Sequence, residues 1–135
     1  MLVLKFGGSS LANADRFVQV ADIVKAKASE SQVAVVVSAP QGVTNHLVAL
    51  AENLHEGEAL AQGLMHFKTP VQCIVDELTD KVPGFNRQQV EQTLIRWEHQ
   101  ISRYLEGAAM LSCCPDHIRA LVISCGERMS VAILQ

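Results

Sequence analysis

The spacing of hydrophobic positions along the chain changes near residue 40. Before it, two short apolar runs, at 2–6 and 33–37, each end in small or turn-forming residues, which is typical of buried strands. Between them, apolar residues recur at helical spacing, with Asn13 placed to cap a helix and Asp15 in its first turn. This order of strand, helix and strand predicts a βαβ unit, with parallel strands and a right-handed connection.

After residue 40 the apolar pattern is helical. One stripe runs from about Thr44, a candidate N-cap, towards a stop at Gly57. A second stripe begins at Leu60, and the sequence Thr69-Pro70-Val71-Gln72 resembles a capping box, which predicts that a new helix starts at residue 70. The longest predicted helix follows the cap Asn86, and its apolar stripe comprises Val90, Leu94, Trp97, Ile101, Leu105 and Ala108.

The last segment combines two signals. Residues 121–123 resemble a strand by composition, whereas apolar residues recur at helical spacing from 118 to 133. We favour a helix, in two pieces that meet at Gly126. The helical pattern stops within an apolar run at Gln135. Two parallel strands also offer too little surface for so many helices to pack on. We therefore expect the first part of a larger α/β domain.

Composition narrows the class of protein. The 135 residues are 49% hydrophobic and 19% charged, with a formal net charge of −3, as expected of a globular chain and not of a nucleic-acid-binding one. We expect no transmembrane segment and no secretory signal, and therefore a cytoplasmic protein. The four cysteines contain no Cys-x-x-Cys pair, which favours reduced, mostly buried thiols over a metal site.

Polar loops follow both predicted strands. The first, Lys5-Phe6-Gly7-Gly8-Ser9-Ser10, suits a phosphate because glycine admits close backbone approach and the lysine is cationic; a plain tight turn is the alternative. The second loop contains Ser38 and Thr44, which are also ordinary turn and capping residues. Because parallel strands end at the same edge of a sheet, Ser9, Ser38 and Thr44 would line one cleft.

Glu127 stands out because it lies in an otherwise apolar stretch. It would either stabilise the start of a helix or bind a positive group. None of the five histidines is assigned to a metal or to catalysis, and Trp97 and Tyr104 are candidates for the core.

Three motifs together resemble the aspartokinases. Residues 5–10 are similar to the signature K-F-G-G-T-S, residues 36–47 to a second motif, and Gly126-Glu127-Arg128-Met129-Ser130 to G-E-x-M-S. The stretch at 13–17, the Ser-Ala-Pro form of the second motif and residues 114–116 look most like the kinase portion of bifunctional aspartokinase and homoserine dehydrogenase enzymes of threonine biosynthesis.

The resemblance implies a three-layer α/β/α amino acid kinase fold, of which residues 1–135 are the N-terminal part. It implies transfer of the ATP γ-phosphoryl group to the β-carboxylate of L-aspartate, with Mg²⁺ bridging the nucleotide phosphates. By this resemblance, Lys5 would neutralise charge in the transition state, and phosphate oxygens would be bound by Gly7, Gly8 and Ser9. The aspartate substrate would be lined by Ser38, Ala39 and Thr44. Its ammonium group would be bound by Glu127. NAD(P) would belong only to a dehydrogenase region that the chain lacks.

The chain departs from this pattern at two positions. Ser9 replaces the usual threonine but keeps a hydroxyl, and Cys125 stands where histidine or arginine is common. We expect the chain alone to be inactive and, because strand edges and the last apolar turn would be uncovered, to form a homo-oligomer. One alternative is a non-catalytic α/β phosphate-binding or assembly module; another is a kinase of a different amino acid such as acetylglutamate, which Phe6 and the motif at 126–130 disfavour.

Overall fold

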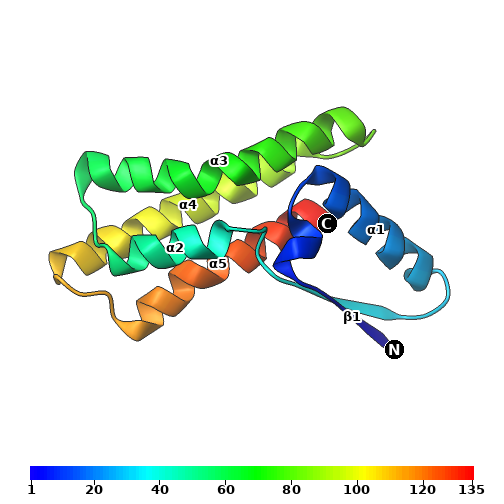
Figure 1. Ribbon diagram of the computed structural model, residues 1–135, viewed down its shortest axis with the longest axis horizontal. Coiled ribbons are helices and arrows are strands. Elements are labelled where there is room, and N and C mark those ends of the chain that lie inside the picture. The colour runs from blue at the N-terminus through cyan, green and yellow to red at the C-terminus, as the bar shows by residue number, and fades with distance from the viewer.

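The computed structural model describes every residue from 1 to 135. A small βαβ unit occupies one end of the molecule, and a group of long helices forms the other (Figure 1). The elements in chain order are β1 (Leu2–Phe6), the short 3₁₀ helix η1 (Gly8–Leu11), α1 (Ala14–Ala28), β2 (Val33–Val37), α2 (Val43–Glu52), α3 (Gly57–Lys81), α4 (Arg87–Met110) and α5 (Asp116–Leu134).

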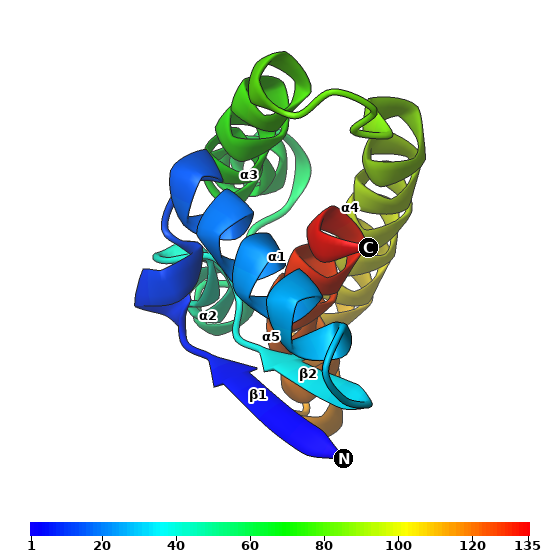
Figure 2. The same ribbon diagram turned by 90° about the vertical axis from the view of Figure 1, so that its right-hand side faces the viewer.

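The βαβ unit confirms the parallel pairing predicted from the sequence. Strands β1 and β2 are parallel, with Lys5 opposite Val36 and Phe6 opposite Val37. Asn13 caps α1 as expected, because its Oδ1 accepts the backbone N–H of Arg16 at 3.0 Å. Helix α1 and the C-terminal end of α5 lie on the same face of the strand pair, where both contact β2 (Figure 2). Because the two strands are parallel, their carboxyl ends lie together, on the side that faces the long helices (Figure 1).

The prediction of a helix start at residue 70 was wrong. Helix α3 runs without a break from Gly57 to Lys81 and contains Pro70. The hydroxyl of Thr69 does not cap a helix start; it donates to the carbonyl oxygen of Met65 at 2.8 Å. The two stripes read from the sequence are in fact one buried face, and its packing outweighs the loss of one backbone hydrogen bond at proline. The members of this face are Leu60, Leu64, Phe67, Val71, Ile74, Val75 and Leu78.

The last segment is helical, as favoured, but it is one helix and not two. Helix α5 passes through Gly126 without interruption. A second correction concerns α2, whose N-cap is Gly42 in a left-handed conformation (φ 85°), so Thr44 lies inside the first turn. Glycine adopts this conformation without the steric penalty that a Cβ brings, which explains why the helix starts before the predicted cap.

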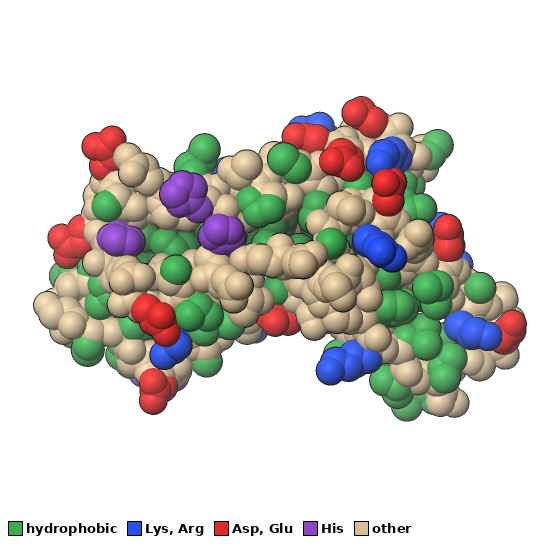
Figure 3. Space-filling view, in the orientation of Figure 1, with side chains coloured by type: hydrophobic (Ala, Val, Ile, Leu, Met, Phe, Trp, Pro, Cys, Tyr) green, Lys and Arg blue, Asp and Glu red, His purple; other side chains and the backbone are tan.

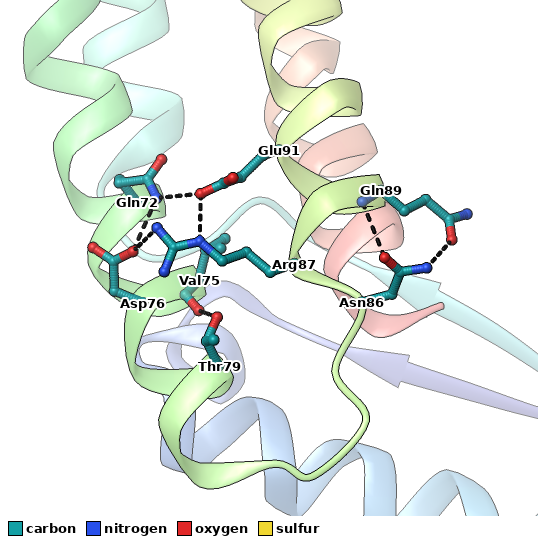
Figure 4. A network of polar contacts seen from close by, with 8 residues as sticks. All are labelled: Gln72, Val75, Asp76, Thr79, Asn86, Arg87, Gln89 and Glu91. Atoms are coloured by element: carbon teal, nitrogen blue, oxygen red, sulfur yellow. Dashed lines mark hydrogen bonds and ion pairs between the residues drawn. The ribbon is translucent and has the colours of Figure 1, made fainter.

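Polar contacts join α3 to α4 near their connecting turn (Figure 4). The guanidinium of Arg87 lies 2.7 Å from both Glu91 Oε1 and Asp76 Oδ1, and the amide of Gln72 donates to the same two carboxylates. The hydrogen bond with Glu91 raises the pKa of Arg87. Because these groups are partly exposed, they fix the pairing of the two helices more than they add stability.

The core lies between the helices and against one face of the strands. Tyr104 and Trp97 are partly buried beside it. The cysteines are all free, but the expectation that most are buried was wrong, since Cys73 and Cys113 are exposed and only Cys125 is fully buried. No helix combines the length and apolarity needed to span a membrane.

Candidate functional site

Three segments that are far apart in the sequence meet at Ala39. On one side, a Cβ placed on Gly8 would lie 3.3 Å from the carbonyl oxygen of Ala39. On the other side, a Cβ placed on Gly126 would lie 2.7 Å from the Cβ of Ala39. The Ser38 N–H also donates to the carbonyl of Phe6 at 3.0 Å. The loop after β1, the loop after β2 and the middle of α5 are therefore in direct contact.

The first loop presents exposed groups at the carboxyl end of β1. The side chain of Lys5 is exposed, and it takes part in none of the ion pairs of the structure. Gly7 and Ser9 are exposed too, and the Ser10 N–H donates to Gly7 O at 3.0 Å to close the turn into η1. An uncommitted ammonium beside exposed backbone and a hydroxyl is suited to binding an anion.

The second loop is more enclosed. Ala39 is buried and Ser38 is half-buried, and the Val43 N–H donates to Pro40 O at 3.1 Å where α2 begins. No side chain caps the start of α2, so its first turn, which includes Thr44, keeps the partial positive charge of a helix N-terminus. This loop supplies small polar groups and a favourable field for a carboxylate.

The third segment contributes a carboxylate. Glu127 is half-buried, yet its Oε2 is enclosed and has no hydrogen-bond partner. The neighbouring guanidinium of Arg128 does not neutralise it, because this group stacks on the ring of Trp97, with 4.6 Å from Cζ to the ring centroid. A buried carboxylate oxygen without a partner is unfavourable until a cation or a donor reaches it. Glu127 can therefore bind a positively charged group.

Cys125 is a buried residue of α5 that contacts its own helix. It is buried, its Sγ lies 3.3 Å from the carbonyl oxygen of Leu121, and burial raises the pKa of its thiol to about 11. The residue thus belongs to the core.

Metal-binding geometry is not found among the side chains. No group of three or more His, Cys, Asp or Glu residues is arranged to hold a metal ion. Histidines gather on the face formed by α2 and α3, where few charged groups are seen (Figure 3), but they form no such group.

The sequence reasoning missed two residues of this region. Gly126 was read as a break between helices, although it is the point where α5 touches Ala39. Ser130 was given no role beyond its place in the third motif, although it is fully buried and its Oγ has no partner. Only the position of both residues within one short motif signalled them.

Comparison with known proteins agrees with this arrangement. The model of the "Amino acid kinase family" matches residues 1–135. The bifunctional aspartokinase/homoserine dehydrogenase of Buchnera aphidicola is 33% identical over the whole chain, which covers 16% of that relative. The corresponding enzyme of Haemophilus influenzae is 34% identical over the whole chain, which covers 17% of it. The chain thus spans about a sixth of the length of these relatives.

Solved structures show the same similarity. Aspartokinase III of Escherichia coli, in complex with aspartate and ADP, superposes with a TM-score of 0.80 and 32% identity, over 99% of this chain and 28% of that one. The form bound to lysine and aspartate gives the same TM-score at 30% identity. The parallel strand pair followed by helices is therefore an α/β arrangement of the aspartokinase type. The chain belongs to the amino acid kinase family and is related to the aspartokinases.

Proposed function

We propose that residues 1–135 are the first part of an aspartate kinase domain and form the aspartate-binding side of its active site. The observation that carries this proposal is the meeting of three motifs at Ala39, where Gly8 and Gly126 approach it from opposite sides. A packing role alone would not require an exposed Lys5 and a Glu127 carboxylate that takes part in no ion pair beside the same junction. The ligand that fits both groups carries an anion at one end and an ammonium at the other.

The phosphoryl group would be held at the first loop. In this reaction an oxygen of the aspartate β-carboxylate forms a bond to the γ-phosphorus of ATP as the bond to ADP breaks. The protein's task is to position the groups and to stabilise the charge on the transferred phosphoryl group. Lys5 supplies that positive charge, while Gly7, Gly8 and Ser9 offer backbone and hydroxyl donors to phosphate oxygens. Mg²⁺ would be held by the nucleotide phosphates.

The aspartate would lie between the second loop and α5. Glu127 would bind its ammonium, because the carboxylate is the acidic group beside Ala39 that lacks a partner. Ser38, Ala39 and Thr44 would line the rest of the subsite, with the uncapped start of α2 favouring a substrate carboxylate. This arrangement orients the β-carboxylate towards the first loop.

The chain by itself would not complete a catalytic cycle. It spans 28% of the aspartokinase III chain that was solved with aspartate and ADP. The proposal therefore assigns most of the nucleotide site to residues that follow in such a kinase. Any bifunctional character, and NAD(P) with it, would depend on a region outside residues 1–135.

A chimeric kinase tests this proposal. The chain would replace the matching N-terminal segment of lysine-sensitive aspartokinase 3 of Escherichia coli, with which it is 36% identical over 133 residues; we call the product the completed kinase. We expect it to release ADP only when L-aspartate is present, and the 135-residue chain alone to release none. A completed kinase that unfolds cooperatively but shows no aspartate-dependent ADP release would contradict the proposal.

A further inference from the structure

We propose that Ser130 is a positioning residue that holds the Glu127 carboxylate in place to receive the substrate ammonium. The inference rests on the proposed function and deepens it. Its starting point is that both side chains contain a buried polar atom without a hydrogen-bond partner, Ser130 Oγ and Glu127 Oε2. These are the buried side-chain oxygens left in this state in the whole chain.

Ser130 differs from several helical hydroxyls of the protein that bond to the backbone. The hydroxyls of Thr79 and Thr93 each donate to the backbone carbonyl one turn earlier, at 2.7 and 3.0 Å. On α5 itself, Ser124 Oγ donates to Leu121 O at 2.9 Å. Ser130 makes no such bond although it is 0% exposed, so bulk water cannot serve it. Its hydroxyl is therefore not used by the backbone of its own helix.

Glu127 and Ser130 are three residues apart within α5. Residues three apart in a helix are neighbours on its surface, with Cβ atoms about 5–6 Å apart. Neither atom has a hydrogen-bond partner in the structure, so the two are not bonded to each other directly. A water molecule that bridges the Ser130 hydroxyl and Glu127 Oε2 would satisfy both atoms at once. The other carboxylate oxygen, Oε1, is not enclosed in this way and remains free for the ammonium.

A hydroxyl in this place fixes the orientation of the carboxylate. Arg128 is engaged with Trp97, and Gly126 has no side chain, so neither neighbour in the helix can hold Glu127. A carboxylate held by a buried donor loses less freedom when it binds a ligand. The competing explanation is that Ser130 is only a small residue that fits a tight space, in which case alanine would serve equally well.

The test compares L-aspartate with succinate in the completed kinase. Succinate has the same two carboxylates but lacks the amino group, so the ratio of the two dissociation constants, measured by calorimetry, reports the ammonium contact. We expect Glu127→Gln to remove the preference for aspartate. We expect Ser130→Ala to weaken aspartate binding about five- to tenfold, the effect of one lost hydrogen bond, and to leave succinate binding unchanged.

Two controls sharpen the result. Ser124→Ala removes a hydroxyl from the same helix that already has a backbone partner, and it should leave the ratio unchanged. In the double variant Glu127→Gln with Ser130→Ala, the serine change should add nothing, because Ser130 acts through Glu127. If Ser130→Ala fails to fold, Ser130→Thr keeps the hydroxyl and must retain the preference for aspartate.

The outcomes separate this inference from the function on which it rests. If Ser130→Ala weakens both ligands equally, or neither, while Glu127→Gln abolishes the preference, Ser130 is only a spacer and the inference is overturned. A loss of preference in Ser130→Thr would overturn it too. If the unmodified completed kinase does not distinguish aspartate from succinate, the ammonium site itself is wrong, and both proposals fail.

Discussion

Replacing Gly126 with alanine should destabilise the protein, although alanine is the better helix former. A Cβ at this position would lie 2.7 Å from the Cβ of Ala39, with Leu47 Cδ1 and Val43 Cγ1 both at 3.5 Å. Favourable carbon–carbon contacts are about 3.5–4.0 Å, so the new methyl overlaps Ala39 by about 1 Å. The side chains of α2 prevent it from moving sideways.

The size of the effect follows from two opposing contributions. Overpacking in a tight core costs about 1–3 kcal/mol, whereas exchanging glycine for alanine within a helix gains up to about 1 kcal/mol. We therefore expect Gly126→Ala to lower the free energy of unfolding by about 1–2 kcal/mol. Urea denaturation of the chain, followed by far-ultraviolet circular dichroism, measures this change.

Gly107 provides a matched control on α4, because a Cβ there would have no atom within 4 Å. Gly107→Ala should stabilise the chain by about 0.5–1 kcal/mol. Adding Ala39→Gly to Gly126→Ala removes the overlapping methyl and should recover part of the loss. If Gly126→Ala proves as stabilising as Gly107→Ala, the close approach of α5 to the second loop is not what the structure indicates.

Four further predictions concern the site, the thiols and assembly. In the completed kinase, Lys5→Ala should lower turnover by orders of magnitude with little change in aspartate binding, because the lysine stabilises charge in the transition state. Near-normal turnover in a steady-state assay would exclude that role. Glu127→Ala should instead raise the aspartate concentration needed for half-saturation, and an unchanged saturation curve would leave Glu127 a structural role only. With a thiol reagent at neutral pH, Cys73 and Cys113 should react quickly because they are exposed. Cys125 should react only after unfolding or as the pH approaches its pKa of about 11. Rapid modification of Cys125 in the folded chain would refute its burial. The 135-residue chain should be a dimer in light scattering, because its strand edges and part of α5 are uncovered, and a cooperatively folded monomer at high concentration would contradict this expectation.

Local pattern was sufficient for the strands and for most helices. The run at 33–37 and the cap at Asn13 describe their elements without help from distant residues. Pro70 and Gly126 were misread for the opposite reason, because both are local signals for a helix boundary that long-range packing overrides. Pro70 is tolerated because the residues before and after it in α3 form one buried face. Gly126 is needed because a Cβ there would overlap Ala39.

For the site too, local sequence pattern predicted one part, and long-range packing determined the rest. The two loops were placed together by the rule that parallel strands end at one edge of a sheet, and the hydrogen bond from Ser38 to Phe6 reflects that neighbourhood. The contact of α5 with this edge has no local signature, because it depends on how α2 and α4 direct the last helix. The unpartnered hydroxyl of Ser130 is visible only after that helix is in place.

The junction at Ala39 also determines when this site can form during synthesis. The two loops are complete once the start of α2 has been translated, but Gly126 and Glu127 emerge only after α2, α3 and α4. Translation adds about 5–20 residues per second, so several seconds pass between the synthesis of the two loops and that of α5. Until then the buried faces of α2 and β2 lack their cover and are open to chaperones or to a second copy of the chain. Helices α2, α3 and α4, which lie between the second and third motifs, thus delay the assembly of the site.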